Sequence, residues 1–342
     1  MNISNSTNST KGPSFNYYFP GEKEILRLAL QIEWQLNTYV FPVIFGVASL
    51  WNILIIFYFV NINLRSLRKM SSYHFLIINL AVADLCVTLG VSILYPFNVK
   101  PLWELGTFGC VFLRHFLSTV CPMISCWLLV LISFARFRSI VYPLRARINK
   151  KKYGLACLSV WVIVSLLNLY IFMNREVKVL RSGVFSICLG SGEHAHAMIQ
   201  YFVNYVLDSF LPFAIMLFLY YQMKKRMNTE ENENAFALNE QSRQRNRRAL
   251  RTIRGLILLF TVTVIPVRIC YVLTWVSYFY ATNNSLFPFR LTSALVLIFT
   301  WLILFVYLMN NALNIFVYAK MIPPFRRFLL TTFTFGMYGK RN

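Results

Sequence analysis

Long apolar runs without charge are the feature that most limits how this chain can fold. A helix that crosses a lipid bilayer needs about 20 mostly apolar residues, and the sequence offers seven segments of this kind. They lie at residues 39–60, 73–96, 112–135, 153–174, 197–223, 255–280 and 291–319. Because they lack the strict alternation of membrane-barrel strands, we predict an all-α membrane protein with seven spanning helices.

The composition supports a chain that lies mostly in lipid. Hydrophobic residues make up 57% of the 342 positions and charged residues only 13%. That balance excludes one large soluble domain and also excludes a disordered chain. The spans contain no nucleophile–base pair that could serve catalysis, so we expect no enzyme activity. A transporter stays as an alternative, although few charges could line a path across the membrane.

The distribution of positive charge predicts the topology of the chain. Its formal net charge is +22, and most Lys and Arg residues lie in the first, third and fifth connections and the C-terminal tail. The positive-inside rule then predicts an extracellular N-terminus and a cytoplasmic C-terminus, as in a multi-pass protein of the plasma membrane. We attribute the charge to this topology and to anionic lipid, and expect no nucleic-acid partner.

The sequence divides into three parts. Residues 1–37 form a short polar head, 38–319 hold the seven spans, and 320–342 form a cytoplasmic tail. Within the tail, residues 323–333 place Phe and Leu beside two arginines, a pattern typical of a helix lying on a membrane surface. Four glycosylation sequons fall on the predicted outer side, at Asn2, Asn5, Asn8 and Asn283.

Two of the seven cysteines lie outside the predicted spans. Cys110 and Cys188 both fall on the oxidising side of the membrane. A bridge between them would stabilise the fold by about 4 kcal/mol, and we predict that disulfide. The other five lie in predicted helices, where we expect them to pack as small apolar residues.

Motifs on successive spans, taken together, resemble the rhodopsin-like (class A) G-protein-coupled receptors over nearly the whole chain. LAVADL contains Asp84, ARFRSIVYPL contains Arg136, and NNALNIFVY contains Asn314 and Tyr318. Further matching residues are Asn52, Trp103, Cys110, Trp161, Pro212, Tyr220, Phe260 and Pro266. The resemblance implies a seven-helix bundle with a short amphipathic helix 8. It also implies that ligand binding outside drives nucleotide exchange on a heterotrimeric G protein inside.

The resemblance implies roles for particular residues. The coupling switch would consist of Arg136, Pro143, Leu144, Tyr220, Asn314 and Tyr318. The only cofactor implied is an allosteric sodium ion, and its candidate ligands are Asp84, Ser125, Asn310 and Asn314. Candidate residues of the ligand pocket are Arg114, His115, Leu117, Asp208, Arg268 and Arg290.

Simpler interpretations of the same charged residues stay open. Arg136 taken alone could be a basic residue that snorkels at a helix end, and Asp84 could be satisfied by polar packing. Asp208 and Arg268 could form a salt bridge that only fixes helix packing. His194 and His196 lack a third ligand, so we expect no metal site there.

Several positions depart from the family pattern. Ala135 stands where the family has Asp or Glu, Val264 replaces a Trp, and Ile315 replaces a Pro. Because Arg136 lacks its acidic neighbour, we expect either raised ligand-independent activity or an atypical switch. Pro122 is an addition, and the stretch from Cys110 to Arg136 is one residue longer than in the family. We therefore predict a bend or bulge near Pro122.

The outer pocket indicates the class of ligand. The stretch around Leu117, Ser118 and Val120 has no aspartate for an amine, and Leu308 occupies the retinal-lysine position. The positive charges of the pocket would suit a peptide carboxylate or another anion, so the resemblance leans toward the peptide receptors. The altered motifs leave one alternative, a receptor-fold protein that works without a G protein as a scavenger or dimer partner.

Overall fold

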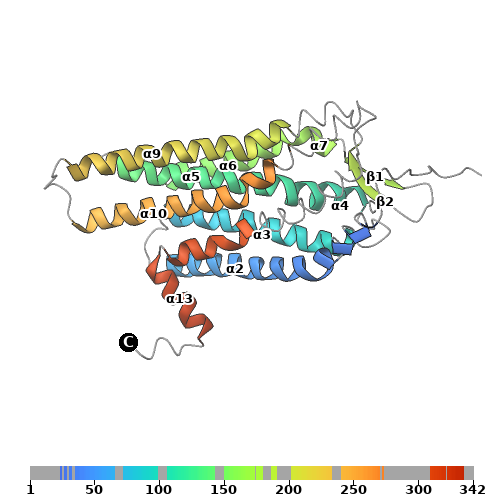
Figure 1. Cartoon of the computed structure of the whole chain (residues 1–342), viewed down its shortest axis with the longest axis horizontal. Coiled ribbons are helices and arrows are strands. Elements are labelled where there is room, and N and C mark those ends of the chain that lie inside the picture. Colours follow the sequence, from blue (N-terminus) through green and yellow to red (C-terminus); the bar gives the residue numbers. More distant parts are fainter. Residues whose placement is uncertain are drawn as a thin grey trace, which may run out of the picture.

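The computed structural model places most of the chain in a helical bundle (Figure 1). It describes residues 24, 27–28, 31–32, 35–65, 72–98, 106–142, 150–173, 175–179, 186–190, 202–232, 240–269, 272, 309–320 and 322–334. The long helices are α2 (Phe41–Arg65), α3 (Ser72–Asn98), α5 (Cys121–Val141), α6 (Lys150–Leu167), α9 (Leu211–Asn232) and α10 (Glu240–Thr263). A further helical segment at 309–320 precedes α13 (Pro323–Phe333).

Five helices in the described part are long and apolar enough to cross a membrane. They are Phe41–Ile62, Ser72–Gly90, His115–Val141, Phe202–Thr229 and Arg243–Ile269. These helices overlap the first, second, third, fifth and sixth predicted spans. The fourth predicted span coincides with α6 and the short α7 (Leu169–Met173), and the helical segment at 309–320 contains the end of the seventh.

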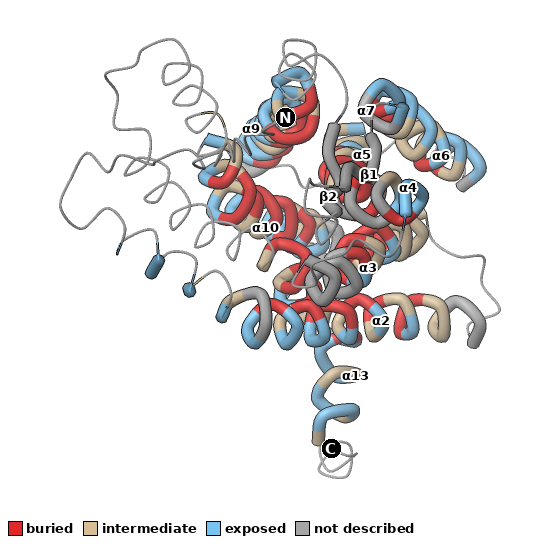
Figure 2. The backbone as a smooth tube through the Cα atoms, turned by 90° about the vertical axis from the view of Figure 1, so that its right-hand side faces the viewer, coloured by how far each residue is buried: buried red, intermediate tan, exposed pale blue. Residues whose placement is uncertain are grey.

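The bundle is apolar on its outside and polar at points in its interior. On α2, Val43, Leu50 and Phe57 are exposed, whereas Asn52 is buried. Figure 2 shows the same division on the other helices, whose buried faces turn toward the centre of the bundle. A contiguous apolar outer face is stable only next to another apolar medium, so this arrangement fits helices surrounded by lipid.

Among the described residues, three stretches of π-helix interrupt the regular helices, and each is followed by a proline. They are η1 (Leu36–Val40), η2 (Cys110–Val120) and η3 (Val206–Phe210), and the prolines are Pro42, Pro122 and Pro212. In each case the residue just before the proline donates its backbone N–H to a carbonyl five residues back. Proline crowds the preceding turn and lacks a donor, so a wider turn relieves the crowding. The predicted bulge near Pro122 is confirmed.

The bulged segment η2 packs closely against α3. A Cβ atom added at Gly90 of α3 would collide with the Cβ of Leu117 in η2. Glycine is therefore the residue that lets these two backbones approach. The contact fixes the position of η2 beside the second spanning helix.

A β-hairpin lies at the end of the bundle away from the α9–α10 connection (Figure 1). Strand β1 (Arg175–Val179) pairs antiparallel with β2 (Ser186–Gly190), with Val177 opposite Cys188. The backbone of β1 lies against η2, close to the short α4 (Gly106–Gly109). The hairpin lies in the connection between the fourth and fifth predicted spans, and it was not predicted from the sequence.

Helix α13 leaves the bundle at the opposite end and turns away from it (Figure 1). Phe325 is fully buried, and its ring centroid lies 4.8 Å from that of Tyr58 and 5.9 Å from that of Phe59. Arg326 and Arg327 are exposed. The amphipathic helix predicted at 323–333 is therefore confirmed.

Candidate functional site

The middle of the bundle holds a buried carboxylate with two polar partners from other helices. Asp84 of α3 accepts a hydrogen bond of 2.5 Å from the Ser125 hydroxyl of α5. It accepts a second, of 2.8 Å, from the Asn314 amide on the segment 309–320. The three side chains are nearly inaccessible to solvent. Three of the four predicted sodium ligands are thus brought together.

The fourth predicted sodium ligand bonds elsewhere. The Asn310 side-chain oxygen accepts a hydrogen bond of 3.1 Å from the Thr263 hydroxyl at the end of α10. Thr263 stands where the family has a cysteine, and its role was not predicted. Nearby, the Asn52 amide donates to the backbone oxygens of Ala48 and Asn311, at 3.0 and 3.1 Å. These bonds tie α10 and α2 to the seventh helix.

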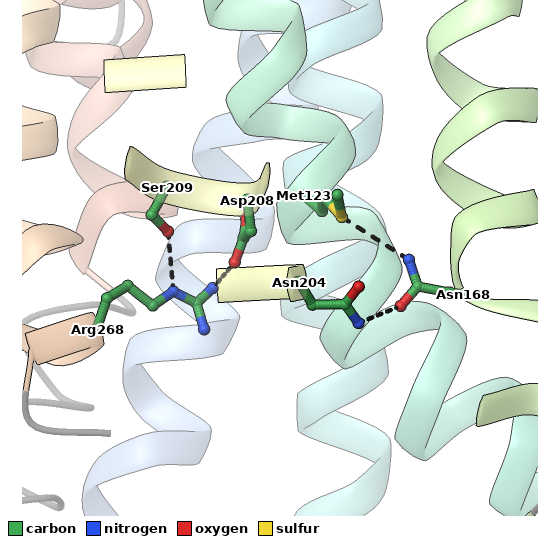
Figure 3. A network of polar contacts seen from close by, with 6 residues as sticks. All are labelled: Met123, Asn168, Asn204, Asp208, Ser209 and Arg268. Atoms are coloured by element: carbon green, nitrogen blue, oxygen red, sulfur yellow. Dashed lines mark hydrogen bonds and ion pairs between the residues drawn. The ribbon is translucent and has the colours of Figure 1, made fainter. Parts of the chain in front are cut away.

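A second buried polar cluster joins the fifth and sixth helices (Figure 3). Arg268 forms an ion pair with Asp208 of η3, and its Nε donates to the Ser209 hydroxyl at 3.0 Å. The Arg268 Cζ also lies 5.3 Å from the ring centroid of Tyr205. The salt bridge between Asp208 and Arg268, one of the two options that their charges suggested, is present. It neutralises the charge of Arg268, one of the positive charges expected to attract a ligand.

A third set of contacts lies beside this pair and was missed from the sequence. The Asn204 amide donates to the Asn168 side-chain oxygen at 2.8 Å, and the Asn168 amide approaches the Met123 sulfur at 3.7 Å (Figure 3). Asn168 and Asn204 are both buried. Two asparagines in otherwise apolar spans were the only signal available, since a buried amide requires a hydrogen-bonding partner.

Arg136 lies near the end of α5, in contact with α3. Its Cζ lies 3.5 Å from the ring centroid of Tyr73. In the described part of the chain, no hydrogen bond joins Arg136 to Tyr220 or to Tyr318, whose phenol is buried without a partner. The contact with Tyr73 was not predicted, because an aromatic residue at a helix start carries no motif.

Other predicted pocket residues lie around η2. His115 is fully buried and Leu117 nearly so, which places both inside the bundle. Arg114 belongs to the same π-helix, but its side chain lies outside the described structure. The same holds for the side chains of Cys110 in η2 and Cys188 in β2, so their disulfide stays a prediction.

Several predicted residues lie wholly outside the described part of the chain. They are Pro143 and Leu144 of the coupling motif, Arg290 of the pocket, and the sequon asparagines Asn2, Asn5, Asn8 and Asn283. Their roles stay predictions.

Curated proteins with similar sequences are receptors. The chain is 28% identical to the urotensin-2 receptor of Homo sapiens over 204 residues, which cover 59% of this chain and 50% of that protein. It is 24% identical to the tachykinin-like peptides receptor 86C of Drosophila melanogaster over 277 residues, or 77% and 52% of the two chains. For the allatostatin-A receptor of Bombyx mori the identity is 27% over 209 residues, or 58% and 56%. The chain thus spans about half the length of the curated relatives it matches.

A family-level match covers most of the chain. The sequence family described as "7 transmembrane receptor (rhodopsin family)" matches residues 51–318. This range runs from the first spanning helix to Tyr318, and it includes all three buried polar clusters. The match confirms the predicted seven-helix bundle and the resemblance, and the family is one of receptors rather than enzymes. The chain belongs to the rhodopsin family of seven-transmembrane receptors.

Proposed function

We propose that the chain is a receptor that transmits the binding of an extracellular peptide to nucleotide exchange on a heterotrimeric G protein. The proposal rests on two buried polar clusters and one cation–π contact, at three levels of an otherwise apolar bundle. They centre on Arg268 near one end, Asp84 in the middle and Arg136 near the other end. Each of the three connects at least two helices, so a change in one can alter how those helices pack.

Two observations support a peptide as the ligand. One relative is named as a receptor for tachykinin-like peptides, and the third helix offers no carboxylate to bind an amine near Leu117. The N-terminus faces outward in this proposal, as the distribution of Lys and Arg predicts. The ligand would then reach the bundle from the side that carries the β-hairpin.

Nucleotide exchange on a panel of purified G proteins tests this function. Membranes bearing the full-length chain are compared with membranes bearing Arg136→Ala at matched surface levels, with and without a panel of neuropeptides. We expect exchange above that of receptor-free membranes from wild type only. Arg138→Ala, two residues further along α5, serves as the control and keeps the exchange. Equal exchange from wild type and Arg136→Ala would contradict the proposal.

The proposed function includes a sodium ion beside Asp84. Hard cations prefer oxygen ligands, and the cluster supplies the Asp84 carboxylate and the Ser125 hydroxyl. The side-chain oxygen of Asn314 is buried and has no hydrogen-bond partner among the described residues. These residues therefore fit a sodium ion, which would add positive charge at the centre of the bundle.

Sodium chloride is expected to raise the melting temperature of the purified chain by a few degrees relative to choline chloride. At a concentration tenfold above its Kd, a bound ion adds about 1.4 kcal/mol to the free energy of unfolding. Asp84→Asn removes the charge and should remove this response. An equal shift in Asp84→Asn and wild type would show that sodium acts elsewhere.

A further inference from the structure

The charged group of Arg136 has an aromatic partner rather than a carboxylate. No carboxylate of a described residue forms an ion pair with Arg136, and its Nε is buried without a hydrogen bond. The residue before it, Ala135, carries no acid. Arg136 is half-buried, and a partly buried cation is stabilised by a nearby source of negative potential.

Tyr73 supplies that potential from the start of α3. The guanidinium carbon of Arg136 lies 3.5 Å from the centre of the Tyr73 ring, well within the range of about 6 Å for a cation–π interaction. The face of an aromatic ring carries partial negative charge, and a guanidinium plane stacks well on it. The Arg136 guanidinium therefore stacks on a residue of α3 with its Nε buried, whereas a snorkelling residue would extend its charge toward the solvent.

The surroundings of Tyr73 connect this contact to the seventh helix. The phenol oxygens of Tyr73 and Tyr318 are both buried and without hydrogen-bond partners among the described residues. The two phenols lie near enough to interact electrostatically. Tyr73 therefore contacts Arg136 of the third helix and lies near Tyr318 of the seventh, both of which carry coupling motifs of the family.

We propose that the Tyr73 ring replaces the missing carboxylate and holds Arg136 inward in the resting receptor. This inference rests on the proposed coupling function, and Tyr73 is a positioning residue for Arg136. Activation would require Arg136 to leave the ring. Although position 135 carries no acid, Arg136 is then still restrained. The restraint is the contact between the arginine of α5 and an uncharged ring of α3.

Ligand-free nucleotide exchange from full-length receptor variants tests the proposal. Tyr73→Phe keeps the ring, and Tyr73→Leu removes it at similar apolar character. We expect Tyr73→Leu to raise exchange about 5- to 30-fold and Tyr73→Phe to stay near wild type. Tyr221→Leu, which removes an exposed tyrosine of α9, is the matched control and leaves exchange unchanged. Equal exchange from the Leu and Phe variants would overturn the role of the ring.

A second readout does not depend on G-protein coupling. A fluorine label on a cysteine introduced by Arg251→Cys, at an exposed position of α10, reports the position of the sixth helix. The chain without that cysteine gives the background. Tyr73→Leu should shift the populations of the fluorine signal in the Arg136 background but produce no further shift in Arg136→Gln, because the contact is already lost.

The two readouts separate the inference from the function on which it rests. If no variant supports exchange but the fluorine signal shows this non-additive response, the Tyr73–Arg136 restraint stands and the coupling function fails. If Tyr73→Leu shifts the fluorine signal equally with Arg136 and with Gln at that position, the restraint is overturned whatever the exchange assay shows. Should Tyr73→Leu fail to reach the membrane, Tyr73→Met applies the same test with a flexible side chain that lacks a ring.

Discussion

Replacing Asp208 with alanine is expected to lower the melting temperature of the purified receptor by about 4–7 °C. The substitution removes the carboxylate that pairs with the Arg268 guanidinium, whose side chain is 11% exposed. Breaking a buried ion pair by removing one partner costs about 3–5 kcal/mol. Each kcal/mol corresponds to about 1.4 °C in a chain of 342 residues, since the entropy of unfolding is about 2.1 cal/mol/K per residue. Thermal unfolding in detergent, followed by size-exclusion chromatography, measures the shift.

The double variant Asp208→Leu with Arg268→Met decides whether the loss comes from the unpaired charge. Apolar residues of similar volume often replace a buried ion pair at no cost, so the double variant should recover most of the melting temperature. If it is as unstable as Asp208→Ala, the pair is needed for packing in its own right. Peptide-stimulated exchange in the stable double variant then shows whether the pair also serves the ligand.

Gly90→Ala is expected to destabilise the receptor by about 1–3 kcal/mol, the usual cost of overpacking a close contact. The new methyl group would collide with the Cβ of Leu117, so α3 and η2 would have to move apart. In other helices the same substitution normally stabilises the chain, because alanine favours the helix. The expected result is therefore opposite in sign to the helix propensity, and the same unfolding assay measures it.

Gly46→Ala is the matched control for this prediction. Gly46 lies in α2, another spanning helix, and a Cβ atom added there has no neighbour within 4 Å. This variant should be neutral or more stable than wild type. In a Leu117→Gly background, which has its own cost because a buried side chain is lost, Gly90→Ala should destabilise less than in wild type, because the Cβ atom that the methyl group meets is gone. A loss of stability in Gly46→Ala equal to that in Gly90→Ala would show that close packing at Leu117 is not the cause.

The sequence predicts the bundle well because the physical signal is long and repeated. A span of about 20 apolar residues is hard to satisfy outside a membrane, and the family motifs then set the order of the helices. The contact between Asp84 and Asn314 could also be predicted, because both residues belong to family motifs that meet inside the bundle. The contact between Asp208 and Arg268 was foreseen as one of two options, because two opposite charges in apolar spans favour each other.

The sequence predicts contacts between residues without motifs poorly. Tyr73 is one of 19 tyrosines, and nothing in its local pattern indicates that a guanidinium lies over its ring. Asn310 was assigned to the sodium site by its motif, but its side-chain oxygen accepts a bond from Thr263. In both cases the outcome depends on the rotation of two helices relative to each other. Periodicity alone does not specify that rotation.

The sequence predicts only one of the three π-helical bulges. Pro122 predicted one of them because it interrupts a span and coincides with an extra residue. Pro42 and Pro212 lie at equivalent places after η1 and η3, yet neither was interpreted in this way. In these three segments a wide turn comes just before a proline, whereas Pro96 and Pro266 are not preceded by one.

The π-helical η2 also determines how the third helix can be aligned with those of relatives. One extra residue in a helix rotates all the side chains on one side of it by about 100° around the helix axis, relative to those on the other side. If an alignment without a gap is correct at Arg136, it therefore assigns every residue of this helix on the N-terminal side of Pro122 to the wrong counterpart. His115 and Leu117 can be matched to ligand-contacting positions of other receptors only after a one-residue gap is placed beside Pro122.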